Sequence, residues 1–178
     1  ALSDCTMAVA TSARRREMRH DSVPAREAAG VLLAAAAAQP VALVFGNETS
    51  GLSGAEARLC NLWAHVPTDA ENSSLNLAAA VQIFAYELRL ATAGDVSGDV
   101  SGDVSGDAPE FAPATIEQVE QLIRHCEHTM LATGFLDPAN PKRLLVRLRR
   151  LLARARLESD EVNILRGFLN AVDKRLPK

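Results

Sequence analysis

Short apolar runs alternate with amphipathic stretches over the first half of the chain. Three apolar runs have the length of buried strands: 7–11, 41–45 and 62–66. Residues 25–38 and 73–90 have helical periodicity, and Ser53 is placed to begin a short helix between the second and third strands. Strands that alternate with helices are typical of a parallel α/β sheet, which is the fold class we predict.

An acidic repeat separates this part from the rest of the chain. Val-Ser-Gly-Asp recurs from Asp95 to Asp107. Such small, polar residues bury too little apolar surface to offset the entropy of ordering, so we expect a flexible linker. The predicted organisation is therefore a sheet domain, an acidic linker and an extension: residues 1–93, 94–113 and 114–178.

The extension is predicted to be a small helical module. Its three helix starts are Thr115 with Gln118 as a capping box, Asn140 before Pro141, and Ser159 before two acidic residues. The first of these helices should reach about Ala132.

Composition and charge exclude several classes of protein. The chain has 178 residues, of which 48% are hydrophobic and 23% charged, and this is ordinary globular composition rather than a disordered or collagen-like one. The longest apolar run, Val31 to Ala38, is too short to cross a membrane. Three scattered cysteines without a CxxC spacing predict a reducing compartment, so we expect a cytoplasmic protein: Cys5, Cys60 and Cys126.

Two polar segments carry candidate ligand-binding chemistry. Residues 46–51 follow a strand and contain two glycines, which let backbone approach a ligand at the carboxyl edge of a sheet; an ordinary tight turn is the alternative. Residues 72–78 place Ser and Asn at a helix start, where free amides bind polar atoms or where the side chains only cap the helix. Asn76, if it lies inside the helix, needs a partner.

Together these segments resemble motifs two and three of the SpoU branch of the SPOUT methyltransferases. The residues that carry this resemblance are Leu43–Leu52, Val66-Pro67, Ser73–Gln82 and Tyr86-Glu87, preceded by Thr11–Arg14. The tail resembles the C-terminal extension of one group in that family, the bacterial tRNA ribose 2′-O-methyltransferases that act on a pyrimidine of the anticodon loop. The similar stretches there are Leu131–Asp137, Asn140–Arg143 and Asp160–Gly167.

The resemblance implies an α/β sheet with a deep C-terminal trefoil knot, an S-adenosylmethionine site in the knot, and a homodimer, with no metal ion and no membrane. The implied cofactor-binding residues are Thr11, Ser12, Ala13, Gly46, Val66, Ser73, Ser74 and Leu75. Glu48 and Asn76 are expected to support the site.

No catalytic base is assigned. The family's first motif, whose Asn and Arg assist deprotonation of the ribose hydroxyl, has no counterpart after Ala1, so we expect this chain to be part of a longer one. Two alternatives remain open: a ribosomal RNA ribose methyltransferase and, for the chain as given, a non-catalytic RNA-binding or dimerisation module.

A basic segment predicts where RNA binds. Residues 142–156 contain seven Lys or Arg and no acid. An apolar stripe is predicted to pack against the module, formed by Leu144, Leu148, Leu151 and Ala155. A second stripe exposes guanidinium groups, and the predicted tRNA-binding residues are Arg14, Arg143, Arg147 and Arg150. A solvated surface and an anionic membrane are the alternatives. His125 and His128 lack a third ligand and are expected to be surface or core residues.

Overall fold

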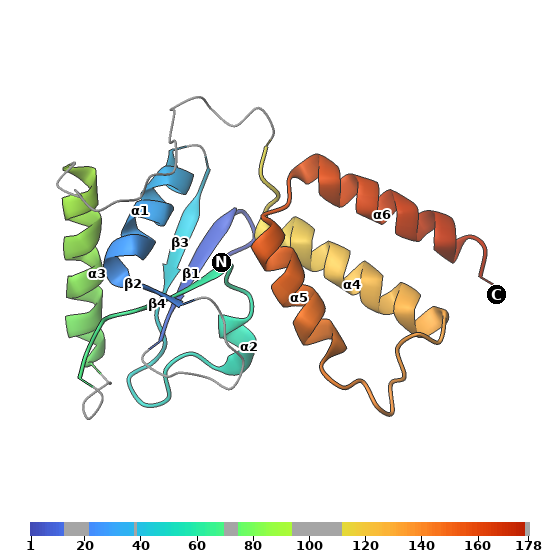
Figure 1. Cartoon of the computed structure of the whole chain (residues 1–178), viewed down its shortest axis with the longest axis horizontal. Coiled ribbons are helices and arrows are strands. Elements are labelled where there is room, and N and C mark those ends of the chain that lie inside the picture. Colours follow the sequence, from blue (N-terminus) through green and yellow to red (C-terminus); the bar gives the residue numbers. More distant parts are fainter. Residues whose placement is uncertain (13–21, 38, 70–74, 94–111, 177–178) are drawn as a thin grey trace. The chain divides into compact units, whose positions relative to one another are not determined.

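The computed structural model describes residues 1–12, 22–37, 39–69, 75–93 and 112–176. The chain forms two compact units (Figure 1). Residues 5–108 form the first, here called the sheet unit, and residues 109–178 together with residues 1–4 form the second, the helical unit. The grouping of the first four residues with the helical unit was not predicted. None of the helices in the described part of the chain has the length and apolarity needed to cross a membrane.

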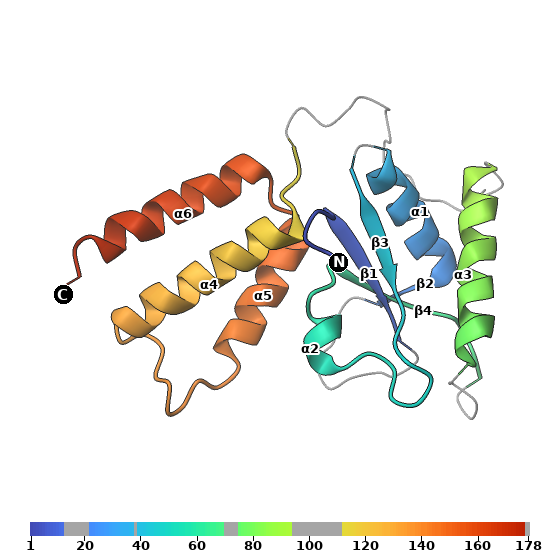
Figure 2. The same ribbon diagram turned by 180° about the vertical axis from the view of Figure 1, so that it is seen from behind.

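The sheet unit is an α/β layer structure, as predicted. Its four parallel strands are β1 (Met7–Thr11), β2 (Ser22–Pro24), β3 (Val41–Val44) and β4 (Leu62–His65). Its helices are α1 (Ala25–Ala36), α2 (Gly54–Ala57) and α3 (Leu77–Thr92). Figure 1 shows α1 and α3 on one side of the sheet and α2 on the other, and the reverse view in Figure 2 agrees.

The strand order β2-β4-β1-β3 places the last strand between two earlier ones. β4 pairs with β1 from Leu62 opposite Val9, and with β2 from Trp63 opposite Ser22. A strand in that position has to be inserted between neighbours that come before it in the chain. The expected trefoil knot itself stays a prediction.

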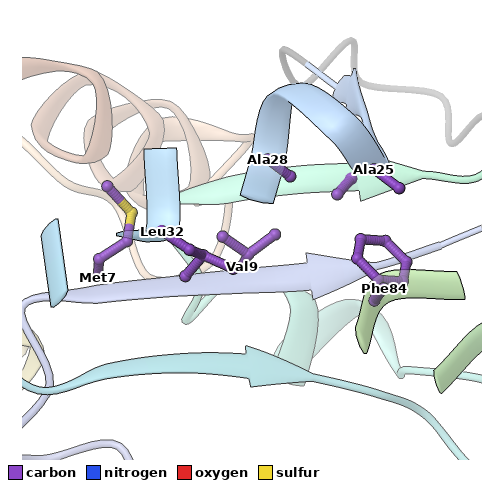
Figure 3. Packing of buried hydrophobic residues seen from close by; sticks show 7 residues of the cluster. Met7, Val9, Ala25, Ala28, Leu32 and Phe84 are labelled. Atoms are coloured by element: carbon purple, nitrogen blue, oxygen red, sulfur yellow. The ribbon is translucent and has the colours of Figure 1, made fainter. Parts of the chain in front are cut away.

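The core of the sheet unit lies between the sheet and the helices α1 and α3. Figure 3 shows buried side chains of β1, α1 and α3 meeting there: Met7, Val9, Ala25, Ala28, Leu32 and Phe84. Because the alanine side chains of α1 are small, the helix packs closely against the sheet. Phe84 of α3 meets Phe45 edge to face, with ring centroids 5.7 Å apart, and this contact fixes α3 beside the end of β3.

Two local predictions in the sheet unit need correction. The last helix begins at Leu77 rather than Ser73, and Asn76 is its N-cap, accepting a hydrogen bond from the Ala78 amide at 2.9 Å. Asn76 thus has its partner without lying inside the helix. The strand β2 was missed because three residues are too few to show a pattern of alternation.

The helical unit contains α4 (Ile116–Ala132), α5 (Leu144–Ala155) and α6 (Ser159–Asp173). Its core comprises Ala114, Leu122 and Val162, with Leu152 of α5 and Leu169 of α6 among the side chains packed on it. The predicted capping box at the start of α4 is confirmed: Gln118 N donates to Thr115 Oγ1 at 3.2 Å, and Thr115 N donates to Gln118 Oε1 at 2.7 Å.

Of the other two predicted helix starts, the first was wrong. α5 does not begin after Asn140, because Lys142 adopts a left-handed conformation with φ 49°, which a helix cannot contain. The helix α6 begins at Ser159 with Asp160 and Glu161 in its first turn, as predicted; its N-cap is Glu158, whose amide donates to Glu161 Oε2 at 2.9 Å.

Candidate functional site

A cavity of about 230 Å³ opens at the carboxyl edge of the sheet. Four segments line it: residues 11–12 at the end of β1, 45–52 after β3, 64–66 at the end of β4, and parts of 75–84 on and before α3. The segment from β3 to α2 and the start of α3 lie at this edge in both views (Figure 1, Figure 2). Parallel strands bring their carboxyl ends to one edge, which is where open α/β sheets bind ligands.

The loop after β3 is organised by one side chain. Asn47 Oδ1 accepts hydrogen bonds from Thr49 N at 3.1 Å, Ser50 N at 2.7 Å and Ser50 Oγ at 3.0 Å. The loop then closes through a bond from Gly51 N to Asn47 O at 3.0 Å. Gly51 has a positive φ of 67°, which a glycine adopts without strain. The turn is therefore held in one shape while Glu48 and Thr49 line the cavity.

Gly46 sits where two parts of this loop meet. A Cβ atom at Gly46 would lie 2.1 Å from both Gly51 C and Leu52 N. Those are backbone atoms, so they cannot move aside as a flexible side chain does. Glycine at this position is required by the close approach of the loop to itself.

The opposite wall of the cavity is tied to the sheet. Thr11 Oγ1 donates to Val44 O at 3.1 Å, and Ser12 N donates to Ala64 O at 3.0 Å. The lining is mixed in character, with hydroxyl, amide and carboxylate groups on some segments and apolar side chains on others. The larger apolar members are Phe45, Leu52, Val66, Leu75, Leu77 and Phe84. Such a lining suits a small ligand that has both a flat apolar part and polar groups.

The structure brings together residues predicted from separate motifs. The predicted residues that line the cavity are Thr11, Ser12, Gly46, Glu48, Val66 and Leu75. Asn76 is not among the lining residues and contributes by beginning α3 beside Leu75. Ala13, Arg14, Ser73 and Ser74 lie outside the described residues.

Several lining residues were not predicted individually, among them Asn47 and His65. Asn47 was not assigned a role, although an Asn between two glycines in a short polar segment after a strand is a turn signal that could have found it. His65 also lines the cavity, and its Nδ1 lies 3.0 Å from the hydroxyl of Ser22 on the neighbouring β2. That pairing depends on a strand that the sequence did not reveal.

The basic face of α5 is only partly as predicted. Arg147 and Arg154 are exposed and Arg150 is half-buried, and none of the three forms an ion pair within the described part of the chain. Arg143, before the helix, is exposed as well. Arg149 instead pairs with Glu120 of α4, so one arginine docks the helix.

The predicted apolar stripe of α5 does not make the contact with the core. Leu151 is 53% exposed and Ala155 is also exposed, whereas Leu152 packs on the core of the unit. The docked face is therefore rotated by about a quarter turn from the predicted stripe, since successive residues are about 100° apart.

The two histidines of α4 do not form a metal site with other described residues. His125 Nε2 lies 2.9 Å from Asp173 Oδ2 of α6, and Thr129 Oγ1 donates to Asp173 Oδ1 at 2.7 Å. Hydrogen bonds from Thr129 and His125 hold the pKa of Asp173 below its usual range. Among the described residues, no group of three or more His, Cys, Asp or Glu could hold a metal ion.

The cysteines are free, and burial makes two of them poor nucleophiles. Burial raises the pKa of Cys60 to about 11 and also raises the pKa of Cys126. A thiol with such a pKa is protonated at neutral pH, and the thiolate is the reactive form.

Comparison with known proteins defines the family. The family model described as "SpoU rRNA Methylase family" matches residues 2–86, and the model described as "tRNA methyltransferase TrmJ, C-terminal domain" matches residues 117–178. The chain therefore belongs to the SpoU methylase family, and the second match places it in the TrmJ branch.

Individual relatives agree with that branch. The chain is 40% identical over 174 residues to the tRNA (cytidine/uridine-2′-O-)-methyltransferase TrmJ of Pectobacterium atrosepticum, a match that covers 98% of this chain and 70% of the relative. It is also 40% identical, with the same coverage, to TrmJ of Escherichia coli strain K12. The crystal structure of TrmJ from Zymomonas mobilis (Z. mobilis ZM4) aligns with a TM-score of 0.76 at 28% identity, covering 97% of this chain and 69% of that one.

Proposed function

We propose that this chain is the cofactor-binding and RNA-binding part of a tRNA 2′-O-methyltransferase that uses S-adenosylmethionine. The observation that carries the proposal is the cavity at the carboxyl edge of the sheet, where residues from three separate sequence motifs meet. The relatives' names supply the reaction class, and tRNA as the substrate.

The cavity residues fit a nucleoside-containing cofactor. Val66, Leu75 and Leu77 offer an apolar surface for a flat base, while the turn at 46–51 offers small residues and backbone groups for the polar part. Glu48 and Thr49 are held at the rim by the bonds that Asn47 accepts. The volume of the cavity, about 230 Å³, lies just below the range of about 300–1000 Å³ typical of small-molecule sites.

The chemistry requires positioning more than a dedicated nucleophile. When bound, the cofactor supplies an electrophilic methyl group on a sulfonium. The chain's own part is to hold the ligand at the rigid edge of the sheet, with Thr11 and Ser12 fixed to β3 and β4. We assign no proton acceptor among the described residues.

The tRNA would be held by the helical unit. Residues 114–178 carry twelve basic and eight acidic groups, and the basic face of α5 presents Arg143, Arg147 and Arg150. Arg14, outside the described residues, belongs to the same proposal. Guanidinium groups bind phosphates, so binding should weaken steeply with salt. We take the substrate position to be a pyrimidine of the anticodon loop, in line with the cytidine/uridine specificity in the relatives' names.

A homodimer in the cytoplasm completes the proposal. Val81 and Tyr86 are exposed apolar side chains on α3, which a second copy could cover. Light scattering should give a dimer for the unchanged chain, and Tyr86→Glu should shift it towards monomer. An unshifted dimer would place the interface elsewhere.

The free cysteines suit a reducing compartment.

Calorimetric titration with S-adenosylhomocysteine tests the cofactor site. The unchanged chain should bind one equivalent per subunit, and Leu75→Asp should abolish saturable binding because it puts a charge in the apolar wall. Leu59→Asp is the matched control, since Leu59 is 38% exposed against 36% for Leu75 but does not line the cavity. RNA binding without any cofactor binding by the folded, unchanged chain would favour a non-catalytic RNA-binding module instead.

Comparing the methylation of tRNA with that of ribosomal RNA distinguishes the two enzymatic alternatives. Methylation of tRNA in preference to ribosomal RNA, by a form of the protein that carries the family's first motif, supports the proposal. The match of residues 117–178 to the TrmJ C-terminal domain favours tRNA over the ribosomal alternative.

A further inference from the structure

The solvent side of α5 carries apolar side chains that the core of the helical unit does not use. Leu151 is 53% exposed, while Leu152 and Arg149 make the contacts with the core and with α4. At about 100° per residue, Leu151 lies about 40° around the helix from Arg147 and about 60° from Arg154. Both arginines are exposed and lie on the same side of Leu151, one about a turn before it and the other about a turn after it.

Binding to a phosphate backbone alone would require the exposed arginines of α5 but not the exposed leucine beside them. Arg147 and Arg154 form no ion pair within the described residues, so both guanidinium groups are available to an anion. An RNA duplex presents phosphates and riboses outwards and keeps its bases stacked inside. Unpaired bases in a loop expose flat apolar faces, which apolar side chains contact favourably.

We propose that α5 binds an RNA loop rather than a duplex, with Leu151 against an unpaired base and Arg147 and Arg154 on the neighbouring phosphates. The inference rests on the proposed function, which supplies RNA as the partner, and it deepens that function by naming the part of the RNA that the helix recognises. Charge complementarity, together with an exposed apolar side chain beside the arginines, favours an RNA loop as the partner of this face.

Fluorescence anisotropy with two labelled RNAs tests it. One RNA is a hairpin with an unpaired loop, and the other is a blunt duplex with the same number of phosphates. Leu151→Ser should lower hairpin affinity about fivefold, as expected for losing half of a leucine's burial, and leave duplex affinity and the salt dependence unchanged. Arg147→Gln should weaken both RNAs and reduce the salt slope by about one.

Ile164→Ser is the matched control, because Ile164 is 70% exposed on α6 and belongs to neither basic nor cofactor surface. Leu151 is exposed, so its replacement should leave the thermal melt unchanged. The inference is overturned if Leu151→Ser affects the hairpin no more than Ile164→Ser does, or if it weakens both RNAs equally. It is also overturned if Leu151→Ser weakens binding to phosphatidylglycerol vesicles but not to the hairpin. Failure of the unchanged chain to bind either RNA would overturn the tRNA part of the proposed function as well.

Discussion

The backbone at Gly51 and Leu52 approaches Gly46 so closely that a single added carbon has no room. The same loop lines the cavity, and its turn depends on the amide oxygen of Asn47. The residues that shape the candidate site therefore act through backbone geometry as much as through side-chain chemistry. This explains why small residues occupy these positions.

Gly46→Ala should destabilise the sheet unit by about 3 kcal/mol, because backbone atoms have to move to admit the new Cβ. Chemical denaturation measures the change. Gly30→Ala is the control: Gly30 lies in α1 with nothing within 4 Å of its added Cβ, so alanine should raise stability by about 0.5–1 kcal/mol. Equal effects at both positions would contradict the close approach.

Acid should weaken the contact that Asp173 of α6 makes with Thr129 and His125 of α4. The pKa of Asp173 is lowered in the folded protein by the hydrogen bonds from Thr129 and His125. A lowered folded pKa gives stability that is present above the unfolded value of about 3.9 and is lost as pH falls through the folded pKa. Urea denaturation between pH 7 and pH 2 should therefore show a weaker decline below pH 4 for Asp173→Asn than for the unchanged chain. Parallel declines would show that the contact contributes nothing.

At the scale of elements, α5 is the least buried helix of the helical unit. It contributes no fully buried residue, and its attachment relies on Leu152 and on the pair between Arg149 and Glu120. Side-chain exposure in that pair is only 25% and 18%, so losing one partner leaves a largely desolvated charge. The orientation of the basic face thus depends in part on one acidic residue of α4, Glu120.

Glu120→Gln should lower the stability of the helical unit by about 1–3 kcal/mol, because Arg149 loses its charged partner. It should also weaken tRNA binding, although removing a negative charge alone would strengthen binding to a polyanion. Glu127→Gln, on the same helix, is the control for charge, because Glu127 forms no ion pair within the described residues. Tighter tRNA binding by both variants would contradict the positioning role of Glu120.

At the scale of the whole molecule, the candidate cofactor cavity and the basic face proposed to bind RNA belong to different compact units. The cavity is lined entirely by residues of the sheet unit, whereas the basic face of α5 belongs to the helical unit. An acidic stretch, residues 94–113 with five acidic and no basic groups, lies between them in the sequence. Each activity should therefore be removable without the other.

A variant in which Arg147 and Arg150 are both replaced by Glu should bind tRNA at least tenfold more weakly. Its salt dependence should be flatter, since two phosphate contacts become repulsive. The affinity for S-adenosylhomocysteine, measured by calorimetry on the same variant, should stay unchanged. Leu75→Asp should show the converse pattern. Loss of both activities in either variant would mean that the two units are not independent.

Local features were predicted well where a few neighbouring residues decide the outcome. The capping box of Thr115 and Gln118 and the N-cap at Ser53 are both present, because capping depends on residues three apart. The start of α5 was missed because the left-handed conformation of Lys142 is not visible in an Asn-Pro pair. The docked face of α5 was missed because leucines occupy two overlapping stripes, and only the position of α4 decides between them.

The sequence by itself determined the alternation of strands and helices and the separate helical module, because periodicity, capping and turn chemistry act over a few residues. The cavity residues were predicted from the resemblance of their motifs to a known family. Only the tertiary structure decided the strand order β2-β4-β1-β3, the close approach of Gly46 to Leu52, the contact of His65 with Ser22, and the pairing of Arg149 with Glu120. These features depend on which distant segments pack together. That choice is made by burial and steric fit across the whole unit rather than by any local pattern.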